Sequence, residues 1–469
     1  MSIVRFMADL EILVIGTGVA GSAAALSAAE SAKALGKTAH IVMLERTNEN
    51  DWGGNSRWTT ANFRMIDEGH LYPTFESDIL KDSKNMASKE YVHRLAIEAL
   101  DTIKWIQSNG VNLESRPENW TVAGFKMGPA GGGLEIITAL RKHAEESGVE
   151  IMFETTANRL LQDASGAIKG VVARERIGKI VNLNSDAVIL ASGGFEGNFE
   201  MLTKYIDRDA VSFRMDTPAT KFHLGECINM AFEVGAAPAG EFGSYHGDVV
   251  DARSNAYRPS IRSFVYGIVV NSNGQRFVDE GMDEMSNSFE FVAREIFKQP
   301  GHKAYLILDK KALAIPNFDK SLKTNLPPLV AKNLQELADI LDIPASRLIE
   351  TVDSFNNSVQ PGEFDPSRND GKRTEGINPK KSNWALQINE PPFSCYPVEG
   401  TMQFTWGGVA SDSKARVLAT NGSPIPGLYA AGEIVGFYYH HYTPGTAVLR
   451  ALTYGRIAGI ESVRWITGD

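Results

Sequence analysis

The chain has 469 residues, a formal net charge of −10 at pH 7 and 43% hydrophobic residues. An acidic balance disfavours binding to nucleic acid and to anionic membranes, and the length predicts about two or three packed units. The two cysteines, Cys227 and Cys395, are too few for a disulfide framework. We therefore expect buried thiols, a cytoplasmic location, no nucleic-acid partner and no membrane insertion.

The first predicted element is a buried strand at residues 10–15, followed by an alanine-rich helix. Three glycines in the pattern GxGxxG separate the two. The first permits a tight turn, the second removes a Cβ that would block a pyrophosphate, and the third lets the helix pack on the strand. Polar and glycine residues interrupt the apolar run 12–29, which argues against a membrane span. The pattern predicts a dinucleotide cradle formed by Gly16, Gly18, Val19, Ala20 and Gly21.

A second buried strand is predicted at residues 41–45, with Glu45 at its end and Arg46 next to it. An acidic residue at this point of a dinucleotide fold accepts hydrogen bonds from ribose hydroxyls. The separation of Gly16 from Glu45 exceeds the roughly 20 residues usual in NAD-binding folds, which fits a longer first helix. We therefore expect Glu45 and Arg46 to contact the dinucleotide.

Alternating α/β elements continue to about residue 235. A further buried strand is predicted at residues 187–191 and ends in Ser192, Gly193 and Gly194. The paired glycines allow a ligand to approach the backbone closely. Residues 1–235 therefore form the first part of the predicted dinucleotide-binding domain.

The middle of the chain has a different pattern. Strands are predicted at residues 264–270 and 304–308, a hairpin turn at 273–274 and a helix at 345–359. The run 361–381 is rich in Pro, Gly, Asp and Lys, which is typical of a solvated loop.

After this loop the chain returns to glycine-punctuated α/β elements and ends in a helix at residues 447–465. We therefore predict an α/β fold in which residues 1–235 and 372–469 form one Rossmann-like domain. Residues 236–371 form an inserted α+β capping domain, and the cleft between the two domains holds the substrate.

Four further signatures accompany the cradle: WGGNS at 52–56, ASGGF at 191–195, PGLYAAGE at 426–433 and GRIAG at 455–459. Together they resemble the FAD-binding flavoproteins of the fumarate reductase and succinate dehydrogenase superfamily. The resemblance covers nearly the whole chain and implies FAD as the cofactor. The residues that it adds to the cofactor site are Gly53, Gly54, Asn55, Ser56, Ala157, Ser192, Gly193, Gly194, Gly432, Glu433, Thr446, Ala447 and Val448.

The same resemblance implies that the FAD is bound non-covalently. The histidine-threonine pair that carries the covalent link in succinate dehydrogenases is replaced here by the residues RWTT at 57–60. We predict no metal site, because the two cysteines lack any metal-ligand partner spacing. Electrons would leave the flavin to oxygen, a quinone or a separate redox protein.

Two stretches depart from the fumarate reductase pattern. In those enzymes an arginine a few residues beyond the position of Glu280 donates the proton, and histidines just before the glycine pair at 407–408 bind substrate. Here the corresponding stretches read GMDEMS at 281–286 and MQFTW at 402–406. Fumarate reduction by the standard route is therefore not expected.

The loop YYHHYTPGT at 438–446 is similar to a substrate loop of 3-ketosteroid dehydrogenases and of the tricarballylate dehydrogenase branch. The resemblance implies that Tyr442 polarises a substrate carbonyl, with a backbone N–H from Gly445 or Thr446. Polarising the carbonyl makes the neighbouring C–H acidic, so a base is also required. The candidate bases are His440, His441 and the Tyr245-His246 pair.

Other residues are candidates for the substrate pocket. Phe404 and Trp406, together with Trp52 and Trp58, suggest an apolar wall. A carboxylate-bearing substrate would need an arginine, and the candidates are Arg57, Arg64, Arg253, Arg258 and Arg262. The expected function is an FAD-dependent dehydrogenase that introduces a C=C bond next to the carbonyl of a small cyclic ketone or oxo-acid. A tricarballylate-like acid dehydrogenase and a flavin-dependent ene-reductase are the alternatives. A flavin-binding module without turnover is disfavoured, because the polar loop would then have no role.

Overall fold

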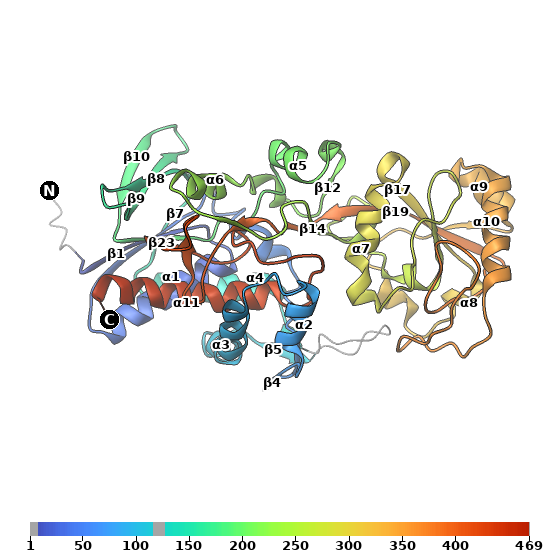
Figure 1. Ribbon diagram of the computed structural model, residues 1–469, viewed down its shortest axis with the longest axis horizontal. Coiled ribbons are helices and arrows are strands. Elements are labelled where there is room, and N and C mark those ends of the chain that lie inside the picture. Colours follow the sequence, from blue (N-terminus) through green and yellow to red (C-terminus); the bar gives the residue numbers. More distant parts are fainter. Residues whose placement is uncertain (1–7, 116–126, 469) are drawn as a thin grey trace.

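The computed structural model describes residues 8–115 and 127–468. Two lobes lie side by side along the long axis of the molecule (Figure 1). Both ends of the described chain are in one lobe, and the middle of the chain forms the other. The predicted insertion of one domain into another is therefore visible in the path of the chain.

A six-stranded sheet forms the centre of the first lobe, in the order β22-β23-β11-β1-β2-β7. Strand β1 pairs in parallel with β2 and β11, and β23 pairs in parallel with β11. The confirmed α/β fold is thus Rossmann-like, and the C-terminal segment supplies part of its sheet. The strands are β1 (Leu10–Ile15), β2 (Ala39–Leu44), β7 (Glu150–Met152), β11 (Ala187–Leu190), β22 (Arg416–Leu418) and β23 (Pro424–Ala430).

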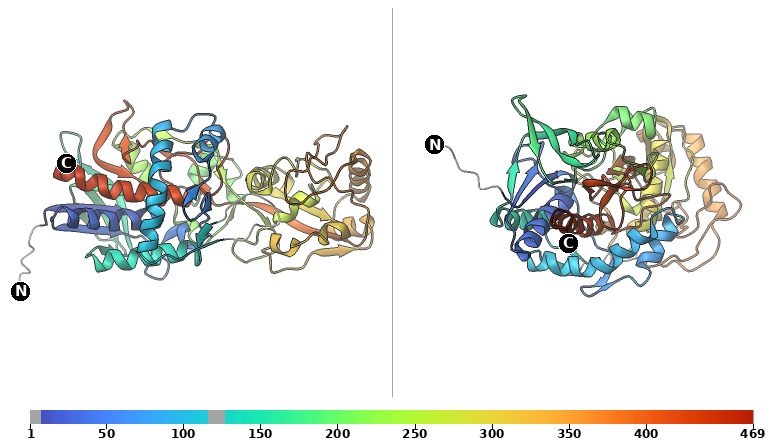
Figure 2. Two further views of the ribbon diagram at one scale, coloured as in Figure 1. Left: turned by 90° about the horizontal axis from the view of Figure 1, so that it is seen from below. Right: turned by 60° about the vertical axis from the view of Figure 1, so that its left-hand side comes forward.

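Helix α1 (Val19–Ala34) and helix α11 (Ala447–Thr467) pack against each other along most of their lengths (Figure 2). Small residues allow this close approach. A Cβ added to Gly455 would lie 2.4 Å from the Ala20 carbonyl oxygen, and one added to Gly459 would lie 2.3 Å from that of Ala24. The GRIAG signature therefore has a packing role in joining the two ends of the chain.

The second lobe contains a sheet in the order β12-β19-β17-β16, with β15 and β18 also paired to β19. It has hydrophobic clusters of its own, packed against α7 (Met285–Phe297), α9 (Leu334–Leu341) and α10 (Ala345–Ser358). The strands are β12 (Arg214–Met215), β15 (Val249–Asp251), β16 (Ile268–Val270), β17 (Lys303–Leu308), β18 (Leu329–Ala331) and β19 (Phe393–Met402).

Two features of this lobe differ from the sequence prediction. Strand β19 lies in the middle of its sheet, so residues assigned to the second part of the FAD-binding domain, 372–469, include the central strand of the capping domain. The predicted strand at 264–270 is a 3₁₀ helix, Arg262–Tyr266, followed by β16. Gly267 lies between the two and packs closely on β17, since a Cβ there would lie 2.3 Å from the Ile307 carbonyl oxygen.

Short strand pairs connect the lobes. Strand β14 (Tyr245–His246) pairs with β20 (Phe404–Thr405), and β13 (Pro238–Ala239) pairs with β21 (Gly408–Val409). In the first pair His246 lies opposite Phe404. The backbone therefore places a capping-domain histidine at the junction.

The remaining helices and strands cover the sheets or project from them. They are β3 (Met65–Asp67), β4 (His70–Leu71), α2 (Phe75–Asp82), α3 (Lys89–Ser108), β5 (Leu113–Ser115), β6 (Met127–Pro129), α4 (Gly132–Glu146), β8 (Thr155–Gln162), β9 (Ile168–Glu175), β10 (Ile180–Asn184), α5 (Phe199–Tyr205), α6 (Glu226–Glu233) and α8 (Lys310–Leu313). Within residues 8–115 and 127–468, we find no helix with the length and apolar character needed to cross a bilayer.

Replacing Gly459 by leucine tests the helix contact. The new side chain would collide with the backbone of α1, so the free energy of unfolding should fall by about 1–3 kcal/mol. Denaturant unfolding of the FAD-loaded protein measures the change. Arg464→Gln, at an exposed position of the same helix, should stay within about 0.5 kcal/mol of the parent. Equal effects of the two substitutions would contradict the packing role.

Candidate active site

One long cavity runs from the carboxyl end of β1 to the junction of the two lobes. At its first end lies the turn between β1 and α1. Gly16 has a φ of +106°, and a Cβ there would lie 2.5 Å from the Ala191 carbonyl oxygen. Helix α1 has no side-chain N-cap and no acidic residue in its first turn, so its N-terminal N–H groups face the cavity.

The side chain of Glu45 is buried at the edge of this turn. One carboxylate oxygen accepts a bond from the Thr17 hydroxyl, and the other accepts bonds from the Thr47 N–H and hydroxyl, both at 2.8 Å. These contacts hold the carboxylate at the cavity wall. Thr17 and Thr47 give no motif of their own in the sequence.

Most of the predicted cofactor residues line this cavity. They are Gly16, Gly18, Val19, Ala20, Glu45, Arg46, Gly53, Gly54, Asn55, Ser56, Ala157, Ser192, Gly193, Gly432, Glu433, Ala447 and Val448.

Three predicted cofactor residues do not line the cavity. Gly21 packs the helix against the turn, since a Cβ there would lie 1.9 Å from the Gly16 carbonyl oxygen. Gly194 lies behind Glu433, and the Thr446 hydroxyl is used in a bond to the Thr443 carbonyl oxygen. These residues shape the cavity from behind.

The other end of the cavity lies between the lobes and is lined by side chains from both. They are Trp58, Asp216, His246, Arg258, Arg262, Phe289, Gln403, Phe404 and Tyr442, together with the backbone of Gly445.

Tyr442 presents its phenol at this end. Its hydroxyl oxygen accepts the Ala447 N–H at 3.3 Å, and the hydroxyl proton has no acceptor among the described residues. The ring centroid lies 4.3 Å from that of His246 and 5.5 Å from that of Phe404. Burial raises the pKa of Tyr442, so the phenol stays protonated at neutral pH. It is therefore a neutral hydrogen-bond donor.

His246 is held by Glu290 of α7. Its Nδ1 lies 2.9 Å from the Glu290 Oε2, and both side chains are buried. Burial lowers the pKa of His246, although Glu290 opposes this effect. A carboxylate only accepts, so the neutral imidazole carries its proton on Nδ1 and leaves the Nε2 lone pair free. Glu290 also accepts the Tyr442 N–H at 3.3 Å, and so binds both residues.

The other predicted bases do not reach the cavity. His441 is exposed, and His440 has a φ of +59° with its N–H donated to Glu241 at 2.6 Å. Tyr245 is buried against Phe213, with ring centroids 5.1 Å apart. The structure therefore brings His246, and not these three residues, to Tyr442.

Two predicted substrate residues also lie elsewhere. Trp406 is buried, with the Arg294 guanidinium 5.1 Å from its ring centroid. Arg64 forms an ion pair with Asp78 at 2.5 Å. Neither lines the cavity, and Trp52, Arg57 and Arg253 do not line it either, whereas Trp58, Phe404 and Gly445 do.

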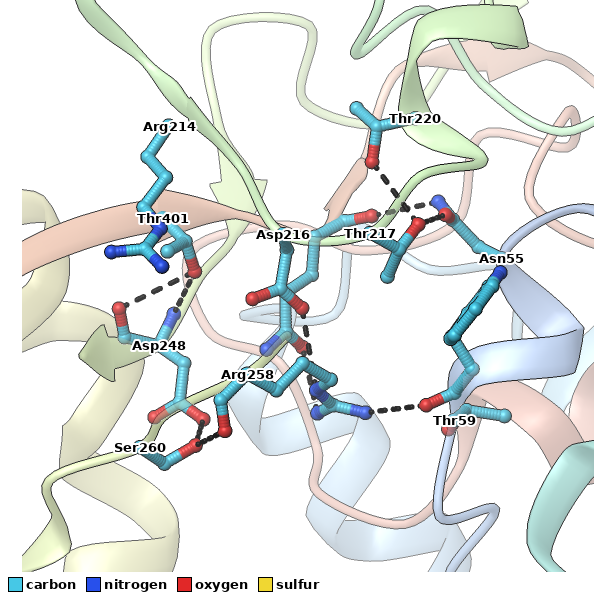
Figure 3. Close-up of polar contacts among 12 residues, drawn as sticks. Asn55, Thr59, Arg214, Asp216, Thr217, Thr220, Asp248, Arg258, Ser260 and Thr401 are labelled. Carbon is cyan, nitrogen blue, oxygen red and sulfur yellow. Dashed lines mark hydrogen bonds and ion pairs between the residues drawn. The ribbon is translucent and has the colours of Figure 1, made fainter. Parts of the chain in front are cut away.

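Two capping-domain arginines do line it. The Arg258 Nε lies 3.3 Å from Asp216, and the Arg262 Nη2 lies 2.8 Å from Asp248. Figure 3 shows the Arg258 guanidinium reaching toward the segment that carries Asn55 and Thr59. Both arginines therefore bring positive charge to the cavity, and each has a buried carboxylate beside it.

The two carboxylates differ in their surroundings. Burial raises the pKa of Asp216 to about 6, although Arg258 opposes this effect. Burial also acts on Asp248, but the Arg262 guanidinium and the Ser260 hydroxyl outweigh it and lower the pKa. Near neutral pH Asp248 therefore balances the positive charge of Arg262, whereas Asp216 balances that of Arg258 less completely.

The observed cradle, the carboxylate of Glu45 and the glycine pairs fit a flavin dinucleotide, and the comparisons agree. A family model described as an FAD binding domain matches residues 11–448, so the chain belongs to this family. A vinyl phenol reductase from Lactiplantibacillus plantarum is 26% identical over 97% of this chain and 96% of its own.

Two solved structures share the fold. The open conformation of a flavocytochrome c3 fumarate reductase has a TM-score of 0.75 at 24% identity, over 97% of this chain and 78% of its own. A 3-ketosteroid-Δ4-(5α)-dehydrogenase from Rhodococcus jostii RHA1 has a TM-score of 0.72 at 22% identity, over 98% of both chains. The superfamily predicted from the motifs is confirmed. The chain is an FAD-dependent oxidoreductase that acts on carbon–carbon bonds of small molecules.

The sequence analysis missed Glu290, Phe289 and Asp216. Glu290 lies between Phe289 and Phe291 on α7 and pairs with Arg294 one turn later, and its partner His246 is 44 residues away. Glutamate–arginine pairs at this spacing are common on helices, so the residue is a weak signal by itself. Only the folded chain shows what it binds.

Replacing Glu45 by alanine should weaken FAD binding by about 10-fold or more, because it removes a charged acceptor from the cavity wall. The flavin-to-protein ratio after dialysis, and the Kd of the reconstituted apoprotein, measure the loss. Glu49→Ala, at an exposed position four residues later, is the control and should retain FAD. A fully loaded Glu45 variant would argue against the assigned role.

Proposed function

We propose that this chain is an FAD-dependent dehydrogenase that introduces a C=C bond next to the carbonyl of a small cyclic ketone or oxo-acid. One observation supports this most strongly. Glu290 binds both the His246 imidazole and the Tyr442 backbone, and these two residues line the cavity between the lobes. A neutral donor and an oriented base are the two groups that removal of a proton beside a carbonyl needs.

In this reaction bound FAD supplies the acceptor for the hydride. Tyr442 donates its hydroxyl hydrogen bond to the substrate carbonyl oxygen, which makes the α-proton more acidic. His246 removes that proton with its Nε2. Glu290 accepts the Nδ1–H bond, holds the ring and stabilises the imidazolium that forms.

The arginines favour the oxo-acid within this substrate class. Guanidinium groups bind carboxylates through paired N–H donors. Arg258 is the better candidate, because its contacts with Asp216, the Trp58 carbonyl oxygen and the Gln403 side chain are all long, at 3.3–3.4 Å. A substrate carboxylate could therefore compete for it.

Reduction of a C=C bond is the second candidate function. The vinyl phenol reductase matches nearly the whole of both chains, and its name favours this direction. The same residues would serve, because a protonated His246 would return a proton to the carbon that it otherwise deprotonates.

Anaerobic addition of substrates to the oxidised holoenzyme tests the proposal. Cyclic ketones and their carboxylated analogues should bleach the flavin absorbance, and saturated carboxylic acids without a ketone should not. Bleaching by the latter alone would contradict the role of Tyr442. Reoxidation of reduced enzyme by an enone, without bleaching by any saturated compound, would establish the reductase.

Tyr442→Phe should retain FAD and lower kcat by about 10²-fold or more, because the carbonyl loses its hydrogen-bond donor. Steady-state turnover with an artificial electron acceptor measures this. His441→Gln alters the adjacent, exposed residue outside the cavity and should change kcat little. Unchanged turnover in Tyr442→Phe would refute the assignment.

The pH dependence of kcat should show the His246 base. Activity is expected to fall as the pH drops through the His246 pKa, which burial places below the usual value of about 6.5. In Glu290→Gln the imidazolium loses its partner, so this pKa falls and the acid limb moves to lower pH. Glu295→Gln, on the same helix and paired with Lys298, should leave the limb unchanged. An unmoved limb in Glu290→Gln would exclude His246 as the base.

A further inference from the structure

A second group of titratable side chains lies beside the cofactor arm of the cavity. Glu196 follows β11, His223 precedes α6 and Glu433 follows β23. Each offers one side-chain N or O atom within 4.8 Å of the other two. His223 and Glu433 line the cavity, and Glu196 lies behind them. We call these three residues the carboxyl–imidazole cluster.

Glycines make room for the cluster. A Cβ added to Gly54 or to Gly193 would lie 3.1 Å from the His223 ring, and one added to Gly194 would lie 2.1 Å from Glu433 Oε1. Gly54 and Gly193 belong to two of the motifs that identify the FAD site. The imidazole therefore packs against the backbone of these two motifs at the cavity wall.

Hydrogen bonds account for only part of the cluster. Glu196 Oε1 is bonded to the His223 Nδ1 and accepts the Asn55 amide at 2.6 Å. Glu433 Oε1 accepts the Thr405 N–H at 2.9 Å. Glu196 Oε2 is buried and receives no N–H or hydroxyl donor from the described residues.

One carboxyl oxygen of Glu196 lies within 4.8 Å of one of Glu433, so the two groups repel each other when both are ionised. Burial raises the pKa of Glu196 to about 8 and that of Glu433 well above its usual range. Burial lowers the pKa of His223. The cluster therefore holds at least one proton near neutral pH.

Other charges near the cluster are few. Arg46 and Glu45 act on His223 from the second strand of the sheet, and Arg46 is itself paired with Glu226 of α6. Because this arginine is already balanced, the described residues offer the cluster no free cation to stabilise an extra negative charge. A proton is the simplest counter-ion available to it.

We propose that Glu196, His223 and Glu433 form a proton store that takes up one proton from solvent when the bound FAD is reduced. Bound FAD would gain one negative charge on accepting a hydride, and this charge would raise the proton affinity of the cluster at the cavity wall. The proton adds to a nitrogen or oxygen lone pair of the cluster, and no electron moves with it. The inference rests on FAD binding and not on the proposed substrate.

The slope of the flavin reduction potential against pH gives the number of protons taken up per two electrons. The measurement needs no substrate, so it is independent of the proposed dehydrogenase reaction. Above the Glu196 pKa of about 8 the oxidised cluster has released a proton, so in that range the holoenzyme should take up two protons, one with the flavin and one in the cluster. Glu196→Gln keeps the side-chain shape and should take up one fewer.

His223→Gln is the second variant and should lose the same proton. Glu233→Gln removes an exposed carboxylate at the end of α6, outside the cluster, and should behave like the parent. Equal proton numbers in the parent and both cluster variants, each loaded with FAD, would overturn the proposal. Tight binding of Zn²⁺ or Mn²⁺ by the parent and not by Glu196→Gln would also overturn it, because the group would then be a metal site.

Discussion

Contact between α1 and α11 is the constraint on which the rest of the structure depends. The first helix of the cradle and the last helix of the chain touch through glycines and alanines at backbone distance. Strand β23 precedes α11 in the chain and pairs with β11, so the helix contact also brings β23 to the sheet. The segment between β23 and α11 must then cross the cavity. That segment carries Glu433, Tyr442 and Gly445, so the packing of two helices places three parts of the site.

A second constraint acts at the junction of the lobes. The pairing of β14 with β20 sets His246 opposite Phe404, and α7 brings Glu290 to it from the capping domain. Glu290 then accepts the backbone N–H of Tyr442, which belongs to the other domain. The catalytic geometry that we propose therefore exists only when the two domains are in contact. A rotation between them would separate the base from the donor, while leaving the FAD cavity intact.

The sequence predicts the cofactor arm of the site much better than the substrate arm. Glycine motifs mark places where the backbone approaches a ligand, and they can be recognised from adjacent residues alone. The cradle and most of the predicted cofactor residues accordingly line the cavity. A catalytic base, in contrast, is determined by the side chains that surround it in the folded protein. His440 and His441 lie closest to Tyr442 in the chain, but a positive φ at His440 accompanies a turn that leaves them outside the cavity. His246 reaches Tyr442 from almost 200 residues away.

The other differences between the sequence prediction and the structure also come from contacts between residues far apart in the chain. Phe404 lines the cavity, but β20 ends at Thr405, so Trp406 does not follow the strand alternation and enters the core. The strand β19 has no partner near it in sequence, and its place in the capping sheet depends on β17, some 90 residues earlier. Apolar runs such as 264–270 fit a buried strand and a buried turn equally well. Tertiary pairing decides each of these cases.

Charge balance links the two halves of the proposed reaction. Arg258 faces Asp216, whose pKa of about 6 makes it neutral under mildly acidic conditions. Protonation of Asp216 frees the arginine for a substrate carboxylate, so low pH favours binding of an oxo-acid. Low pH also protonates His246 and removes the base. Binding and proton removal therefore depend on pH in opposite senses. Burial raises the pKa of Asp216 and lowers that of His246, so the two titrations approach each other. With the usual values the base would be lost well above the pH at which Asp216 is protonated, and burial of both groups narrows that separation.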